Sequence, residues 1–261
     1  MISKNKIKLI KSLSQKKYRV KENLFLAEGN KITRDFLMSD FRIHLIICTD
    51  DFYKSIQKYI SGNVELLIAS QEDIHKCSLQ KSPQEALILC EIPKRNFNYD
   101  ILNNDIILCL DGIQDPGNFG TIIRIADWFG IKTICASKNT ADVFNPKVVQ
   151  ASMGSILNVK TYYTDLPGII KKANLENIPT YGTFLNGKNI YTEQLPENGI
   201  IVMGNEGNGI SKDLELIIKN RLHIPSIETV HGKSTNSLNV SIATAIICSE
   251  FRRVKLQGYS K

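Results

Sequence analysis

Short apolar blocks alternate along the chain with polar stretches of helical length. In the first 94 residues, four such blocks predict strands, at 24–27, 43–48, 64–69 and 86–92. Ile7, Ile10 and Leu13 have the spacing of one helix face, and another helix is expected from about Asn30. This half of the pattern predicts a small α/β sandwich.

The second half of the chain repeats the alternation with longer helices. Strands are expected at 105–110, 132–136, 159–163, 178–184 and 200–203, and helices at 116–129, 145–151, 166–174, 211–219 and 238–253. Strands that alternate with helices in this way favour a mostly parallel sheet. The polar, Asn-rich stretch 94–104 separates the two halves, so we expect a first domain at 1–98, a linker at 99–104 and a second domain at 105–261.

Charge is concentrated at the amino terminus. The 261 residues carry a formal net charge of +7, yet residues 1–21 hold eight Lys or Arg and no acidic residue. A cluster of cations at one end of a chain is typical of a protein that binds a polyanion, most often a nucleic acid. The alternative is a lysine-rich helix face that is only solvated.

The cysteines indicate the cellular compartment, and the sequence argues against a metal site, a secretory signal and a membrane span. Six cysteines lie mostly in apolar runs and form no CxxC pair, which suits reduced core residues of a cytoplasmic protein. The four histidines lack metal-ligand spacing, so no metal is expected. Lys8 and Lys11 interrupt any secretory signal, and the longest uncharged run, 234–249, is too short and polar to span a membrane.

A first motif lies where the strand at 105–110 gives way to a helix. Asp115 and Pro116 are ordinary helix-opening residues, at the N-cap and first helical positions. Capping does not explain Asn118, Gly120 or Arg124; a glycine inside the first turn costs helix stability and indicates close approach by a backbone or ligand. Arg124 could instead pair with Asp127 on the same helix.

Two further motifs follow near the carboxyl terminus. The strand at 200–203 runs into a glycine-rich loop, 204–209, whose spacing is not that of a dinucleotide-binding fingerprint. Ile224-Pro225 is followed by Ser237-Leu238-Asn239-Val240-Ser241 at the start of an apolar helix, where polar side chains need partners. The alternative role for this last motif is a plain N-cap by Asn236 or Ser237. Residues 231–235 look like the end of a P-loop, but Ile at position 227 replaces the required glycine.

Taken in order, these motifs resemble the SpoU/TrmH family of RNA 2′-O-methyltransferases. The first motif is matched by Asp115, Pro116, Asn118, Gly120 and Arg124; the second by Asn205, Glu206, Gly207 and Gly209; the third by Ile224, Pro225 and 237–241. The stretch 144–154 is also similar to the family, whereas the loop 226–236 is longer than its counterpart there. Leu13, Lys16, Lys17, Arg19, Phe25, Glu28 and Gly29 resemble a substrate-binding domain related to ribosomal proteins that bind kinked RNA.

The resemblance implies an S-adenosylmethionine-dependent enzyme that methylates a ribose 2′-hydroxyl, with a deep carboxyl-terminal trefoil knot and a homodimer. It implies catalytic roles for Arg124, Asn118, Glu206, Ser237 and Asn239. It places the cofactor against Met203, Gly204, Asn205, Ile224, Leu238 and Leu185, and RNA against Lys16, Lys17 and Arg19. Because arginine keeps its proton in proteins, Arg124 is expected to stabilise an alkoxide or phosphate rather than act as a base.

The favoured substrate is a guanosine in ribosomal RNA. A transfer RNA ribose methyltransferase and a catalytically silent RNA-binding or ribosome-assembly protein of the same fold are the alternatives. A nucleotide-dependent oxidoreductase is disfavoured because the dinucleotide fingerprint is missing. An enzyme methylating a base nitrogen would normally lack the pair Asn118 and Arg124.

Overall fold

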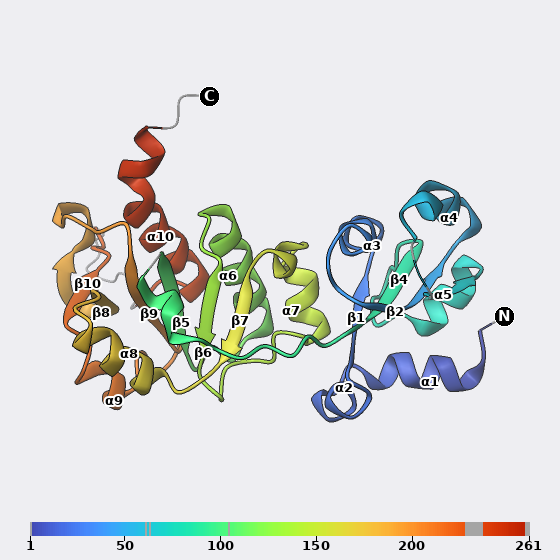
Figure 1. Ribbon diagram of the computed structural model, residues 1–261, viewed down its shortest axis with the longest axis horizontal. Helices are drawn as coiled ribbons and strands as arrows, with labels where there is room; N and C mark the ends of the chain where they lie inside the picture. Colours follow the sequence, from blue (N-terminus) through green and yellow to red (C-terminus); the bar gives the residue numbers. More distant parts are fainter. Residues whose placement is uncertain (1, 61, 63, 104, 228–236, 259–261) are drawn as a thin grey trace. The chain divides into compact units, whose positions relative to one another are not determined.

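The structure is a computed structural model, and it describes residues 2–60, 62, 64–103, 105–227 and 237–258. The described chain divides into two compact units (Figure 1). Unit 1 comprises residues 1–94 and 142–157, and unit 2 comprises residues 95–141 and 158–261. The expected α/β class is confirmed in both units.

Unit 1 is built around a four-stranded sheet of order β1-β4-β2-β3. Its strands are β1 (Leu24–Glu28), β2 (Ile43–Cys48), β3 (Glu65–Ile68) and β4 (Ala86–Glu91). Its helices are α1 (Lys4–Ser12), α2 (Lys16–Glu22), α3 (Asn30–Leu37), α4 (Asp50–Ile56), α5 (Gln71–Cys77) and α7 (Pro146–Ala151), with short 3-10 turns η1 (Gln57–Tyr59) and η3 (Ser155–Leu157). Strand β4 runs antiparallel to both neighbours, whereas β2 and β3 are parallel.

Alternation along β1 sends its side chains to two different cores. Leu24 and Leu26 pack with Ile10 of α1 and Ile74 of α5. On the opposite face, Phe25 joins a cluster of rings with Phe36, Phe41 and Phe144. This sheet with helices on both faces is the predicted α/β sandwich.

Residues 142–157 join unit 1, although they lie far along the sequence from its other residues. The rings of Phe144 and Phe25 have centroids 4.6 Å apart, and α7 contacts β1. The apolar and polar pattern predicts this segment in the second domain; in the structure it belongs to unit 1, and Phe144 and Val148 are buried.

Unit 2 holds a six-stranded sheet of order β10-β8-β9-β5-β6-β7, in which every strand pair is parallel. Its strands are β5 (Ile106–Asp111), β6 (Thr133–Ala136), β7 (Lys160–Tyr163), β8 (Thr180–Asn189), β9 (Gly199–Gly204) and β10 (Asn220–His223). Its helices are α6 (Pro116–Trp128), α8 (Leu166–Leu175), α9 (Lys212–Glu215) and α10 (Val240–Gln257), with 3-10 turns η2 (Tyr99–Asn103) and η4 (Ile190–Thr192). The expected parallel sheet is confirmed.

Helices cover both faces of this sheet. On one face, Ile107 of β5 and Val202 of β9 pack with Ile169 of α8 and Leu214 of α9. On the other, α10 contacts both β9 and α6 (Figure 1). Burial of both faces explains why β5 and β9 are almost continuously apolar.

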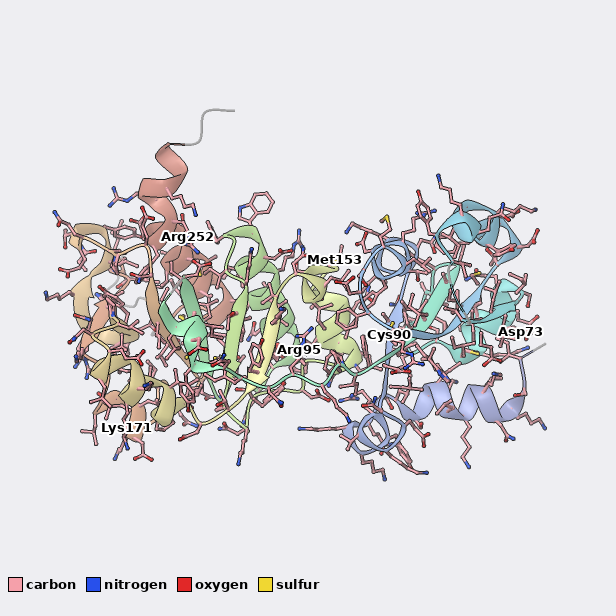
Figure 2. The ribbon with its side chains drawn as sticks, viewed as in Figure 1. Asp73, Cys90, Arg95, Met153, Lys171 and Arg252 are labelled. Carbon is pink, nitrogen blue, oxygen red and sulfur yellow. The ribbon has the colours of Figure 1, made fainter. Side chains whose placement is uncertain are left out.

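One buried arginine fixes α10. Arg252, labelled in Figure 2, donates to the carbonyl oxygens of Phe129 and Glu197 at 3.1 and 3.2 Å and pairs with the Asp105 carboxylate. Because these acceptors follow α6, precede β9 and precede β5, the arginine ties α10 to three points of unit 2.

Two elements have other bounds than expected, and one strand was not expected. Strand β8 continues to Asn189, α9 ends at Glu215, and β10 was not predicted because its sequence, NRLH, is mostly polar. Most of the long loop 226–236 lies outside the described residues, as do Asn236 and the 231–235 stretch.

Candidate active site

The first two motifs meet at the carboxyl edge of the parallel sheet. Strands β5 and β9 are neighbours, and Asp111 at the end of β5 is in register with Gly204 at the end of β9. The loops that follow the two strands therefore leave the sheet side by side. In open α/β sheets this edge, where the chain order reverses, is the usual position of a ligand site.

The first motif opens α6 as expected. The Asp115 carboxylate accepts the backbone N–H of Asn118 at 2.7 Å, and Pro116 stands at the start of the helix. Gly120 is buried on the inner side of the helix. The cap fixes the first turn, and with it the direction of the Asn118 side chain.

The second motif is a tight loop held by Asn205. Asn205 and Gly209 exchange two backbone hydrogen bonds of 2.9 Å, and the Asn205 Oδ1 accepts the N–H groups of Gly207 and Asn208. Its Nδ2 donates across to the carbonyl oxygen of Gly112, at 2.7 Å, in the first motif. The side chain of Asn205 thus shapes its own loop and joins that loop to the neighbouring one.

A chain of side-chain hydrogen bonds connects all three motifs. Asn239 Nδ2 donates to Asn118 Oδ1 at 2.9 Å, and Asn118 Nδ2 donates to Glu206 Oε1 at 2.9 Å. The three side chains come from α6, the loop after β9 and the residue before α10. Each amide donates to the next group, so the chain has a fixed direction that ends on a carboxylate.

Asn239 also caps α10. Its Oδ1 accepts the N–H of Ser241 at 2.9 Å and the Ser241 hydroxyl at 2.6 Å. A plain N-cap by Asn236 or Ser237 was the alternative role for this motif, and Asn236 lies outside the described residues. Because the cap uses Oδ1, the amide nitrogen is left to face Asn118, and the polar residues on this apolar helix satisfy one another.

Arg124 is exposed on α6, and within the described parts of the chain it has neither a hydrogen bond nor an ion pair. The alternative pairing with Asp127 is not present: Asp127 accepts a hydrogen bond from Asn158 Nδ2 at 3.2 Å instead. The exposed guanidinium is therefore accessible to an incoming anion.

The residues expected around the cofactor fall into two groups. Met203 and Gly204 are buried at the end of β9, where a Cβ on Gly204 would lie 2.3 Å from the backbone carbon of Gly209. Leu185 and Leu238 are exposed by 74% and 48%. Ile224 is half-buried. The turn at Gly204 admits no side chain, and Leu185 and Leu238 each present an exposed apolar group.

Of the residues expected to contact RNA in unit 1, two are exposed and one is buried. Lys16 and Lys17 are exposed at the start of α2. Arg19 is 1% exposed: its Nε donates to Asp142 at 3.0 Å, and its Nη1 donates to the carbonyl oxygens of Leu13 and Ser14. The structure corrects the interpretation of Arg19, because its guanidinium is used inside unit 1 and does not face solvent.

Sequence reasoning missed two groups that build the site. The Asp111 carboxylate accepts the N–H of Ser211 at 2.7 Å and so fixes the end of the second motif. The carbonyl of Gly112 receives Asn205, and Gly112 has a φ of +71° that favours glycine. Their position directly after an apolar strand was the available signal. Ser237 is exposed beside Leu238.

Within the ranges that the structure describes, no three His, Cys, Asp or Glu side chains form a group able to hold a metal ion. None of the described helices is both long and apolar enough to cross a membrane.

The chain resembles known proteins over nearly its whole length. It is 29% identical over 249 residues, 95% of this chain and 96% of the other, to the 23S rRNA (guanosine(2553)-2′-O)-methyltransferase RlmP of Bacillus subtilis (strain 168). The solved structure of a candidate RNA methyltransferase of the TrmH family from Porphyromonas gingivalis matches with a TM-score of 0.87 and 38% identity, over 97% of this chain and 99% of that one. An AdoMet-bound rRNA methyltransferase from Sinorhizobium meliloti matches with a TM-score of 0.85 and 26% identity, over 100% and 97% of the two chains.

Both halves of the chain also match protein families. Residues 4–87 match the MRM3-like substrate binding domain. Residues 105–249, which include all three motifs of the candidate site, match the SpoU rRNA methylase family. The chain belongs to the SpoU rRNA methylase family.

Proposed function

We propose that this protein transfers a methyl group from S-adenosylmethionine to a ribose 2′-hydroxyl of RNA. The observation that carries the proposal is the hydrogen-bonded chain Asn239–Asn118–Glu206, which joins three separate motifs at the carboxyl edge of the sheet. Such a chain fixes side chains that orient a hydroxyl nucleophile, and orientation alone is worth about 7–11 kcal/mol in favourable cases.

The residues present suit S-adenosylmethionine. Exposed apolar side chains at Leu185 and Leu238 offer cover for an adenine ring and an aliphatic chain. The tight turn at Gly204 and Asn205 offers backbone groups to the adenosine. When bound, the cofactor supplies an electrophilic methyl group. The AdoMet-bound relative from Sinorhizobium meliloti, aligned over the whole chain, supports this choice.

The chain's own groups then prepare the nucleophile. Asn118, Glu206, Ser237 and Asn239 position the ribose and its neighbouring phosphate. Arg124 lies on the same helix as Asn118, is exposed to solvent, and stabilises the alkoxide as the 2′-hydroxyl gives its proton to solvent water. A forked, permanently charged guanidinium suits an oxyanion better than it suits proton abstraction.

The proposed substrate is a guanosine in ribosomal RNA. The Bacillus subtilis relative carries that substrate in its name and aligns with 95% of this chain. A transfer RNA substrate and a silent RNA-binding protein stay as alternatives. The exposed guanidinium of Arg124, which has no partner in the described part of the chain, and the hydrogen-bonded side-chain network favour an active enzyme over a silent one.

We assign RNA docking to residues 1–98, the linker to 99–104 and methyl transfer to 105–261. The match of residues 4–87 to a substrate-binding domain supports the first assignment. Lys16 and Lys17 at the start of α2 provide exposed cations for phosphates. Lys17 also lies over the ring of Tyr18, with Nζ 4.8 Å from its centroid.

We further propose a homodimer, a trefoil knot at the carboxyl terminus and a cytoplasmic location. Large apolar side chains on α6 and at the start of α10 favour the dimer: Trp128 is 84% exposed and Ile242 52%. Six free, buried cysteines suit a reducing compartment. Light scattering of the purified protein tests the dimer, and a Trp128→Glu variant that is monomeric would support this interface.

The function is tested with purified protein, tritiated S-adenosylmethionine and ribosomal RNA from a strain lacking the gene. The proposal predicts labelled RNA that yields a 2′-O-methylated nucleoside, mapped to one position. Incorporation into a base, or none with either ribosomal or transfer RNA, would contradict it.

A further inference from the structure

Unit 1 contains a cavity that the proposed chemistry does not use. Its volume is about 270 Å³, and it lies between the end of β1, the turn after α5 and helix α7. Leu26, Leu79 and Pro146 form apolar walls, while Glu28 and Lys147 contribute charged groups. Pockets for drug-sized ligands measure about 300–1,000 Å³, so this one suits a smaller, flat group.

A buried carboxylate lines the cavity. Glu28 is 7% exposed and accepts hydrogen bonds from the Ser78 hydroxyl and from the N–H of Leu79. Burial raises the pKa of its carboxyl group, against the opposing effect of these two bonds. An ionised carboxylate has about four acceptor positions, and hydrogen bonds from described residues occupy two of those of Glu28. The cavity therefore favours a ligand that donates N–H groups and excludes an anion from its interior.

The rim of the cavity is polar. Gln80 Nε2 donates to Gln150 Oε1 at 2.8 Å, which ties the turn after α5 to α7. Lys147 is exposed next to this bridge. A matching ligand has a flat apolar body to pack against the walls and an edge of N–H donors to meet Glu28. An attached phosphate would lie at the rim, near Lys147.

We propose that this cavity holds one unstacked guanine base of the RNA that the enzyme binds. Guanine is the RNA base whose Watson–Crick edge presents two adjacent N–H donors, N1–H and N2–H, to a carboxylate. Its faces pack between Leu26 and Leu79, and its phosphate stays outside beside Lys147. Sequence-specific proteins commonly read RNA through such splayed bases. The inference rests on the proposed function in taking RNA as the ligand.

The base preference can be measured without methyl transfer. Full-length protein is titrated, by fluorescence anisotropy, with oligouridines of one length that carry a single central guanosine, inosine, adenosine or abasic position. A bidentate base contact is worth about 1–3 kcal/mol, so the guanosine oligomer is expected to bind at least about fivefold more tightly than the adenosine or abasic one. Inosine lacks the N2 amino group, so the wild-type protein is expected to bind the inosine oligomer much less tightly than the guanosine one.

Three variants locate the preference. Glu28→Gln presents an N–H group where guanine needs an acceptor. Ala151→Leu fills the cavity from α7. Each variant should bind all four oligomers with the affinity that the wild type has for the abasic one. Glu72→Gln, at an exposed glutamate on α5 paired with Lys76, is the matched control and should behave like the wild type. Circular dichroism melting establishes that each variant is folded.

Equal wild-type affinity for guanosine and abasic oligomers would overturn the inference. So would a guanosine preference that survives in both Glu28→Gln and Ala151→Leu but disappears in Asn118→Ala, because the base would then be read at the candidate active site. A protein that shows the Glu28-dependent preference but no methyl transfer would refute the proposed function and leave this inference standing.

Discussion

Asn239 donates its amide hydrogen to Asn118 Oδ1 over 2.9 Å, although 121 residues separate the two along the chain. The same side chain caps α10 through its Oδ1. One residue therefore both starts the last helix and aligns the first motif. Folding of α10 and assembly of the candidate site are coupled through this amide.

Substitution of Asn239 separates the two roles. Asn239→Asp keeps a capping oxygen but loses the N–H donated to Asn118, so methyl transfer should fall about 100-fold while the melting temperature stays near that of the wild type. Asn239→Ala should lose activity and, in addition, about 1 kcal/mol of stability through the lost cap. Single-turnover kinetics and urea unfolding measure the two effects. An active Asp variant would show that the bond to Asn118 has no role in the reaction.

Two glycines of the second motif should respond differently to alanine. A Cβ on Gly204 would meet the backbone of Gly209 at 2.3 Å, so Gly204→Ala must displace the loop and should raise the dissociation constant for S-adenosylmethionine at least about tenfold. Among the described residues, other than its chain neighbours, a Cβ on Gly207 would meet Asn205 Oδ1 at 3.6 Å, an ordinary contact, so Gly207→Ala should bind the cofactor nearly as well as the wild type. Isothermal titration compares them, and equal affinities would refute the role of the turn.

Arg19 and Lys17 form a matched pair of cations on α2. Arg19→Ala leaves the Asp142 carboxylate and two carbonyl groups without their donor, and should cost about 3–5 kcal/mol of unfolding free energy. Lys17→Ala should change stability by less than about 0.5 kcal/mol, and should weaken RNA binding with a shallower dependence on salt. Urea unfolding and filter binding at several salt concentrations measure the pair. If Arg19→Ala is fully stable and impaired only in RNA binding, the original interpretation of Arg19 was right.

The buried thiols predict a loss of stability in alkali. Burial raises the pKa of Cys48 to about 11 and that of Cys248 to about 12, so the folded state favours their neutral forms. Their contribution to stability is complete below the thiol pKa of the unfolded chain, about 8.5, and is lost as pH rises towards these higher values. Urea unfolding at pH 8 and pH 10.5 should show the decrease, and Cys48→Ala should show a smaller one. An identical pH dependence in the variant would exclude a contribution from Cys48.

The spacing of apolar residues and the helix-capping residues were sufficient to predict most strands and helices. Strands such as β5 and β9 are easily recognised because burial on both sheet faces makes them continuous apolar runs. Strand β10 was missed because its four residues are largely polar, and pairing with β8 determines its conformation. The placement of 142–157 could not be predicted either. Phe144 and Val148 indicate burial in a core, but an apolar side chain does not specify which core.

The candidate site shows the same limit. The resemblance to the SpoU/TrmH family led us to expect Asn118, Glu206 and Asn239 in the site, yet their mutual hydrogen bonds depend on strand order, which a single sequence does not give. Arg19 was misassigned because a buried and an exposed cation look alike in sequence, and its partner Asp142 lies 123 residues away. The cap at Asn239 was missed because three nearby polar residues could each have begun the helix.

Arg124, which has no partner among the described residues, is proposed to stabilise the ribose alkoxide during methyl transfer. The most direct test is single-turnover methyl transfer by Arg124→Ala, with cofactor affinity measured in parallel and Arg253→Ala as the control, at an exposed arginine paired with Glu250. The variant is expected to react about 10²–10³-fold more slowly than the wild type, with cofactor affinity and melting temperature nearly unchanged. An Arg124→Ala enzyme that methylates RNA at the rate of the Arg253→Ala control would contradict this proposal.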